Sequence, residues 1–178
     1  MNKYVALMRG INVGGNNKVE MKKLKLIFES LGYCNVSTYI NSGNVIFDTE
    51  KEEGKLVIEI EKTLKKNFGF EIKCLIRDQE NIIKINKKIP KEWKNDTEQK
   101  TDILFLWDEF QNKKTLELIA TNPVVDNLLY IDGTIIWNVR RSDYTKSGMK
   151  KFIGTKVYKN MTARNVNTVL KLGEMMNK

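Results

Sequence analysis

The sequence predicts an α+β protein made of two ferredoxin-like halves, of which the second is incomplete or rearranged. The first half, residues 1–78, has strand and helix patterns in the order β-α-β-β-α-β, which is typical of a split βαβ unit. A lysine-rich connector over 79–100 leads to a second half at 101–178, where such patterns recur. The hairpin segments YINSGNVIF and YIDGTIIW also match when one deletion is allowed. This match indicates an internal duplication, with chance similarity between two hairpins as the alternative.

Each element of the first half has a local signal. KYVALMRGI reads as a strand, and VEMKKLKLIFESLG reads as a helix because its apolar residues follow helical spacing: Leu24, Ile27, Phe28 and Leu31. NVSTYI and NVIFDT are strands joined by the turn NSG. EEGKLVIEIEKTLKKNFG is a helix that closes at Gly69, and FEIKCLIRD is the fourth strand. The first strand is apolar on both faces, so we expect both sides of the sheet to be covered.

The second half carries weaker signals. TDILFLWD is a predicted strand, and QNKKTLELIA is a predicted helix that Pro123 ends. NLLYIDGTIIWNVRR is a predicted hairpin around Asp132 and Gly133. MTARNVNTVLKLGEMM is a predicted terminal helix, with Thr162 as its N-cap and a polar, basic first turn.

The composition excludes several chemistries. The chain has no histidine, which removes the commonest general base, the usual catalytic triads and the usual zinc and copper sites. Its short acidic groupings lack the calcium-loop pattern, so we predict no metal and no cofactor. Any catalysis would depend on lysine, arginine, tyrosine or carboxylate groups, and the sequence leaves enzyme activity open. Cys34 and Cys74 lie on strands expected at opposite edges of one sheet, so we predict no disulfide between them.

Positive charge is concentrated near the C-terminus. The formal net charge is +9, and the residues from Arg140 onward carry ten Lys and Arg against two acids. The preceding 139 residues are almost balanced, with 21 basic and 20 acidic side chains. Such asymmetry is typical of a local anion-binding face. No apolar run resembles a signal peptide's core or approaches the ~18 to 20 residues of a membrane span, so we expect a soluble, cytoplasmic protein without a membrane partner.

The loop RGINVGGNNK, from Arg9 to Lys18, is the first candidate site. Gly14 and Gly15 expose successive backbone amides just before a helix, where the helix dipole favours an anion. The loop is neither a dinucleotide-binding GxGxxG motif nor a Walker A motif. The structural alternative is that its glycines supply positive φ angles and its asparagines cap the helix.

Two further segments contain candidate residues. The turn NSGN includes Asn41, and we reject its Ser42 as a nucleophile because no base accompanies it. Arg164 and Asn165 would lie in the first turn of the terminal helix, where Arg140 could join them; alternatively they lock that helix to the sheet. The complete set of candidate ligand-binding residues is Arg9, Asn12, Gly14, Gly15, Lys18, Asn41, Arg140, Arg164 and Asn165.

Three segments together resemble a known family: YVALMRGINVGGNNKVEMKKL, TYINSGNVIF and TARNVNTVLKL. They are similar to DUF1697, a bacterial family of unknown function, and the similarity spans essentially the whole chain. The resemblance implies two ferredoxin-like α+β halves and assigns no substrate or catalytic residue. Many relatives have tryptophan after the Arg-Asn of the last motif, whereas this chain has Val166. A stacking role of that tryptophan therefore cannot be transferred to this chain.

Two functional hypotheses follow. The first is a protein that binds an anionic small molecule, a phosphorylated metabolite or a nucleotide, between its two halves, with Arg9, the Gly14 and Gly15 amides, Lys18 and Arg164 at one site. The second is a module that binds nucleic acid without sequence specificity through the basic C-terminal segment. Trp137 and Tyr144 are the nearest candidate stacking groups for that role. The RNP1 pattern of RNA-binding ferredoxin-like domains is absent.

Overall fold

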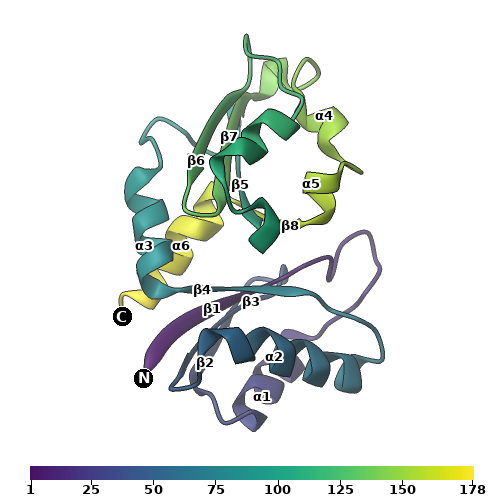
Figure 1. The fold of residues 1–178 in the computed structure, drawn as a ribbon, viewed down its shortest axis with the longest axis vertical. Coiled ribbons are helices and arrows are strands. Elements are labelled where there is room, and N and C mark those ends of the chain that lie inside the picture. Colours follow the sequence, from purple (N-terminus) through teal and green to yellow (C-terminus); the bar gives the residue numbers. More distant parts are fainter. The chain divides into compact units, whose positions relative to one another are not determined.

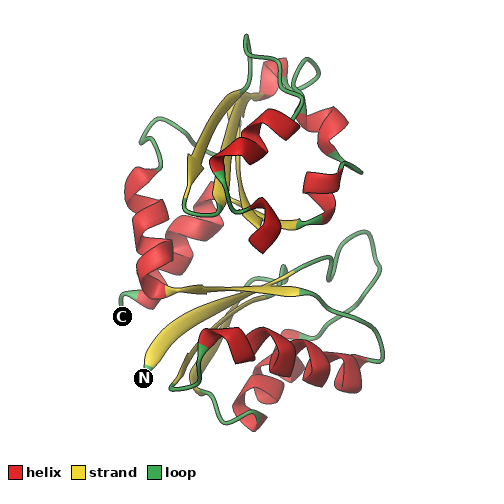
Figure 2. Ribbon diagram, in the orientation of Figure 1, coloured by secondary structure: helices red, strands yellow, loops and turns green.

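A computed structural model describes residues 1–178 and divides the chain into two compact units. The first unit comprises Met1–Glu80 and Met175–Lys178, and the second comprises Asn81–Glu174. Each unit contains one four-stranded antiparallel sheet together with helices, as Figure 2 shows. The chain is therefore an α+β protein. None of its helices combines the length and the apolar character that crossing a bilayer requires.

The first unit has the predicted order of elements (Figure 1). They are β1 (Asn2–Met8), α1 (Met21–Ser30), β2 (Cys34–Tyr39), β3 (Asn44–Thr49), α2 (Glu53–Phe68) and β4 (Cys74–Asp78). The strand order across the sheet is β2-β3-β1-β4. Cys34 and Cys74 therefore lie on strands at opposite edges of the sheet, as predicted, and both are free thiols.

The core of the first unit lies between one face of this sheet and its two long helices. The alternate β1 residues Tyr4, Ala6 and Met8 belong to this core. α1 contributes Leu24, Ile27 and Phe28, and α2 contributes Leu56, Ile60 and Leu64, so the helical spacing seen in the sequence marks the buried stripes. Val5 and Leu7, on the other face of β1, are also fully buried. The prediction that both faces of the first sheet are covered is confirmed.

The second unit has a sheet with the equivalent order β6-β7-β5-β8. Its helices and strands are α3 (Gln79–Lys88), β5 (Gln99–Leu106), β6 (Asn127–Ile131), β7 (Thr134–Arg140), α4 (Met149–Phe152), α5 (Lys156–Lys159), β8 (Met161–Asn165) and α6 (Val166–Met176). Two of them, α3 and α6, extend across the boundary between the units. Short 3₁₀ helices cover Asp108–Phe110, Lys113–Leu118 and Arg141–Asp143. The first two 3₁₀ helices, α4 and α5 pack on one face of this sheet around Trp137.

The predicted connector over 79–100 includes α3, which buries Ile82 and Ile85. Two local predictions for the second half require correction. The helix predicted over QNKKTLELIA is a 3₁₀ helix over Lys113–Leu118. The terminal helix does not start at Thr162, because residues 161–165 form β8 and pair with β5. The N-cap of α6 is Asn165, whose Oδ1 accepts a hydrogen bond from the Thr168 N–H at 2.9 Å.

The two units repeat one arrangement of strands. β1 and β5 each lie between the third and fourth strands of their sheets. The similar hairpin sequences both join the second strand to the third, at the β2–β3 and β6–β7 turns. In the strand register, Arg77 of β4 lies opposite Val5 of β1, and Arg164 of β8 lies opposite Ile103 of β5. The two arginines therefore hold equivalent positions in the two sheets. This correspondence supports the internal duplication that the hairpins indicate.

Candidate functional site

A hollow of about 530 Å³ lies in the first unit beside the start of α1, and we call it the α1 hollow. It is formed by the loop between β1 and α1, the first residues of α1 and the turn between β2 and β3. Four of the predicted site residues line it: Asn12, Gly15, Lys18 and Asn41. The other lining residues are Asn16, Val19, Glu20, Met21 and Lys22.

The glycine pair forms the tip of the loop. Val13 and Asn16 pair as a short antiparallel bridge, with the Asn16 N–H donating to the Val13 carbonyl at 3.1 Å. Gly14 and Gly15, between them, have φ angles of 59° and 80°. Positive φ at both central residues is what a tight type I′ hairpin turn requires. A Cβ at either position would meet no atom within 4 Å, so backbone conformation rather than space requires glycine here.

Asn12 holds the loop in shape. Its Nδ2 donates to the carbonyls of Val19 and Asn41, both at 2.9 Å, and its Oδ1 accepts from the Val19 N–H at 2.8 Å. Asn17 adds a hydrogen bond from its Nδ2 to the Gly10 carbonyl at 3.0 Å. The amide of Asn12 is thus engaged within the protein and shapes the wall of the hollow.

The NSGN turn packs closely against the end of β1. The Met8 N–H donates to the Gly43 carbonyl at 2.8 Å. A Cβ on Gly43 would lie 2.7 Å from Met8 Cβ, and its φ of 74° disfavours other residues, so glycine is required here. Asn44 closes the turn by donating from its Nδ2 to the Tyr39 carbonyl at 2.9 Å and to Ser42 Oγ at 3.1 Å. Ser42 is part of the turn's hydrogen bonding.

The start of α1 gives the hollow its electrostatic character. The Leu24 N–H makes the first hydrogen bond of the helix, to the Glu20 carbonyl at 2.9 Å. No side chain caps α1 and no acidic residue lies in its first turn, so the preceding backbone N–H groups point out of the helix end. The lining contains two lysines, Lys18 and Lys22, and one carboxylate, Glu20. A helix end with free amides and a net positive lining attracts an anion.

Other predicted site residues lie outside the lining. Gly14 is at the exposed loop tip, and Arg9 is a half-buried residue whose N–H donates to the Lys73 carbonyl at 2.8 Å. Arg140, Arg164 and Asn165 belong to the second unit, and Arg140 is exposed at the end of β7. The α1 hollow is lined by first-unit residues only.

Arg164 is a buried strand residue and does not belong to the first turn of a helix. Its guanidinium donates to Thr162 Oγ1 at 3.0 Å and to the Ala163 carbonyl at 2.7 Å. Burial lowers the pKa of the Arg164 guanidinium to about 10. Arg77, at the equivalent place in β4, likewise donates to the carbonyl of the preceding residue, at 3.0 Å. We interpret this shared hydrogen bond as part of the repeated strand architecture.

Sequence reasoning missed a buried polar network around Asp126 in the second unit. Its carboxylate accepts hydrogen bonds from Trp137 Nε1 at 3.0 Å and from the N–H groups of Asn122 and Gly148, both at 2.8 Å. Ser147 Oγ also donates to it. Burial alone would raise the pKa of Asp126, but these hydrogen bonds outweigh burial and lower it. Trp137 is fully buried, so its prediction as a stacking group is wrong.

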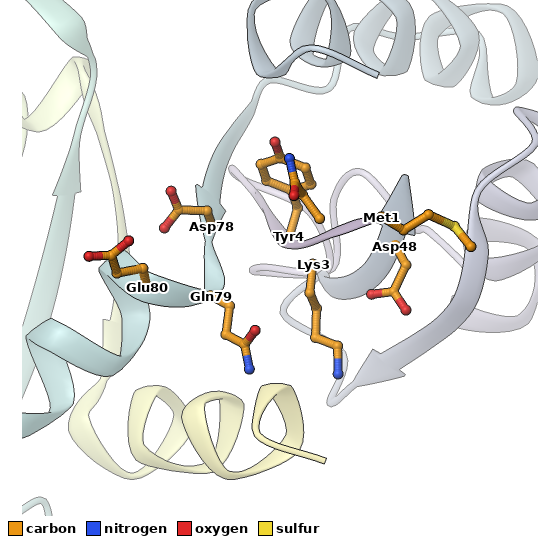
Figure 3. Close-up of a pocket in the computed structure, with 8 residues that line it drawn as sticks. Met1, Lys3, Tyr4, Asp48, Asp78, Gln79 and Glu80 are labelled. Atoms are coloured by element: carbon orange, nitrogen blue, oxygen red, sulfur yellow. The ribbon is translucent and has the colours of Figure 1, made fainter. Parts of the chain in front are cut away.

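A second hollow of about 420 Å³ lies at the start of β1 (Figure 3). In the picture, Asp78 and Glu80 lie on one flank and Asp48 on the other, with Lys3 between them. Asp48 Oδ2 accepts a hydrogen bond from Asn35 Nδ2 at 2.7 Å. No group of three His, Cys, Asp or Glu side chains in the chain is arranged to hold a metal ion. The remaining lining residues are Met1, Asn2, Tyr4 and Gln79.

Comparison with known proteins gives a family and a structural relative. The family model described as "Protein of unknown function (DUF1697)" matches residues 1–137. Among solved structures, the chain is similar to the conserved bacterial protein SP0830 from Streptococcus pneumoniae, with 29% identity and a TM-score of 0.84. That match covers 98% of each chain. No curated protein matches the chain.

Proposed function

The chain belongs to the DUF1697 family of proteins of unknown function. We propose that it binds a small anionic ligand in the α1 hollow. The uncapped start of α1 carries the proposal, because its outward N–H groups lie beside Lys18 and Lys22. A phosphorylated metabolite or a nucleotide has the required negative group. The phosphate would accept hydrogen bonds from the helix amides and be balanced by the two lysines.

The second unit provides an internal comparison for this proposal. There, the segment after β5 contains Asp108 and Glu109 within a 3₁₀ helix, and a further 3₁₀ helix stands where α1 would follow. The second unit therefore builds this connection without a glycine turn or a long helix, although Lys113 and Lys114 stand at the start of its second 3₁₀ helix. The features of the β1–α1 loop go beyond what connecting two strands requires, and they favour a binding role.

The size and lining of the hollow indicate which part of the ligand is recognised. A volume of about 530 Å³ falls within the range of roughly 300–1,000 Å³ that is usual for small-molecule sites. No aromatic side chain lines it, so it offers no stacking surface for a base. Recognition through the phosphate group, with Asn41 and Glu20 available to hydroxyl groups, is the chemistry that these residues favour.

A thermal-shift titration with inorganic phosphate, a sugar phosphate and a nucleoside monophosphate tests the proposal. We expect at least one of them to raise the Tm of the protein. The double variant Lys18→Gln/Lys22→Gln should lose this rise. The matched control Lys62→Gln/Lys66→Gln removes two exposed lysines from α2 and should keep it. No rise with any of the three ligands, or equal loss in both variants, would contradict the proposal.

We also infer that the two units are ferredoxin-like. The first unit supports this inference with its β-α-β-β-α-β order and its β2-β3-β1-β4 sheet. The second unit has the equivalent strand order, with 3₁₀ helices replacing the first long helix and α4 and α5 preceding the last strand. An experimental structure of each unit would test the assignment.

A further inference from the structure

The second unit contains a short segment with concentrated positive charge, Arg140–Lys159, which we call the basic segment. Seven of its residues are basic and one, Asp143, is acidic. All seven basic side chains are exposed: Arg140, Arg141, Lys146, Lys150, Lys151, Lys156 and Lys159. This surface is separate from the α1 hollow, which belongs to the first unit.

Most of this charge is not neutralised within the protein. Lys146 pairs with Asp143 at 2.9 Å, and Lys156 approaches Glu109 at 3.6 Å. The remaining lysines of the segment, together with Arg140, form no ion pair: Lys150, Lys151 and Lys159. In the first unit, by contrast, several lysines of comparable exposure face glutamates, as Lys65 faces Glu71 at 2.9 Å. The basic segment therefore retains a net positive potential.

The fold holds these side chains on the outside of a packed layer. α4 and α5 are consecutive one-turn helices along one side of the second unit (Figure 1). They bury Met149, Phe152 and Val157 in the core around Trp137 and leave their lysines exposed. The start of α4 is anchored by the Gly148 N–H, which donates to Asp126. The charges are thus presented by an ordered surface, which reduces the conformational entropy that binding would cost.

The distribution of groups favours an extended polyanion that is contacted through its phosphates. The four lysines of α4 and α5 supply several separate exposed charges, which suits a ligand with many phosphates. The segment offers no exposed aromatic ring, since Phe152 is buried and Tyr144 and Tyr158 are half-buried. Single-strand binding surfaces depend on such rings for base stacking. A duplex presents its phosphates outward and needs no stacking partner.

We propose that the basic segment binds double-stranded nucleic acid through backbone phosphates and without sequence specificity. The contacts come from Lys150, Lys151 and Lys159, with Arg140 and Lys156 as neighbouring charges. Binding of this kind releases condensed counterions, so log K falls linearly with log salt, by about 0.9 per phosphate neutralised on B-form DNA.

Fluorescence anisotropy with a labelled short DNA duplex, titrated at several salt concentrations, tests this proposal. We expect binding at low salt and a steep salt dependence. The variant Lys150→Gln/Lys151→Gln/Lys159→Gln should weaken binding and reduce the slope by about 0.9 for each lysine removed. The control Lys62→Gln/Lys66→Gln/Lys88→Gln removes the same charge from exposed helix positions and should leave the slope unchanged. Circular dichroism of both variants establishes that each is folded.

Four results would overturn the proposal. The first is the absence of binding to the duplex at low salt. The second is an equal reduction of the slope in both triple variants, which would show that only net charge matters. The third is tighter binding to a single strand of the same length. The fourth is tighter binding to vesicles that contain anionic lipid, which would assign the surface to a different partner.

Discussion

The side-chain amide of Asn12 donates to the backbone carbonyl of Asn41 at 2.9 Å and so connects two loops that lie 29 residues apart in the sequence. The same side chain forms two hydrogen bonds with Val19. One asparagine therefore fixes the β1–α1 loop, the approach to α1 and the β2–β3 turn relative to one another. The α1 hollow, which these three segments form, depends on that connection.

Replacing Asn12 should destabilise the protein and impair the hollow. Asn12→Ala removes all three hydrogen bonds and leaves the part-buried N–H and carbonyl of Val19 without these partners, which costs about 1–3 kcal/mol. Alanine also tolerates the φ of 54° at this position less well than asparagine. Urea denaturation measures the loss. Asn16→Ala, in the same loop and exposed, is the control and should have little effect; equal losses in the two variants would contradict the structural role of Asn12.

The β2–β3 turn should tolerate no side chain at Gly43. A Cβ there would lie 2.5 Å from Ile11 Cδ1 and 2.7 Å from Met8 Cβ, and the φ of 74° already disfavours L-residues. We expect Gly43→Ala to lower the free energy of unfolding by about 2–4 kcal/mol, combining overpacking with backbone strain. Gly15→Ala shares the positive φ but faces open space, so it should cost only about 1–2 kcal/mol. A smaller loss at Gly43 than at Gly15 would refute the close packing of this turn.

The Asp126 network should make the stability of the second unit depend on pH. Hydrogen bonds lower the pKa of Asp126 in the folded state. The ionised carboxylate therefore contributes its full stabilisation of the fold at any pH above the unfolded pKa of about 3.9. The contribution is lost as the pH falls through the lowered pKa. Asp126→Asn should cost about 2–3 kcal/mol at neutral pH, because it replaces a charged acceptor of four donors.

Tryptophan fluorescence during urea denaturation measures this stability, and Trp137, one of the three tryptophans of the chain, reports on the network because its indole N–H donates to Asp126. The difference in stability between the wild type and Asp126→Asn should narrow as the pH is lowered through the acidic range. A difference that stays constant between neutral pH and about pH 3 would mean that the Asp126 charge does not stabilise the fold.

The first unit was largely predictable because its signals are local. The spacing of Leu24, Ile27 and Phe28 identifies the buried stripe of α1, and the first strand's unbroken apolar run indicates burial on both faces. The second unit was less predictable. Residues 162–165 resemble a capped helix start in the sequence, yet pairing of β8 with β5 makes them a strand. Tertiary pairing overrides a local helix signal in this segment.

The candidate site was predictable in part. The glycine pair and the NSGN turn marked two of the three walls of the α1 hollow. Glu20 and Lys22 were overlooked, although they lie in the predicted helix within four residues of the loop. The network around Asp126 had no local signal, because Ser147 is 21 residues from Asp126 and the two meet only in the folded unit. Contacts of this kind depend on the packing of segments distant in sequence.

Anion binding in the α1 hollow can be observed residue by residue in an NMR titration of the ¹⁵N-labelled protein with inorganic phosphate, followed by a phosphate ester. If the α1 hollow binds anions, the backbone amides of Met21, Lys22 and Lys23 and those of the Gly14–Gly15 turn should shift progressively and saturate. The same amides should remain unperturbed in Lys18→Gln/Lys22→Gln. Saturable shifts confined to other parts of the chain, or no saturable shift at all, would contradict anion binding in the α1 hollow.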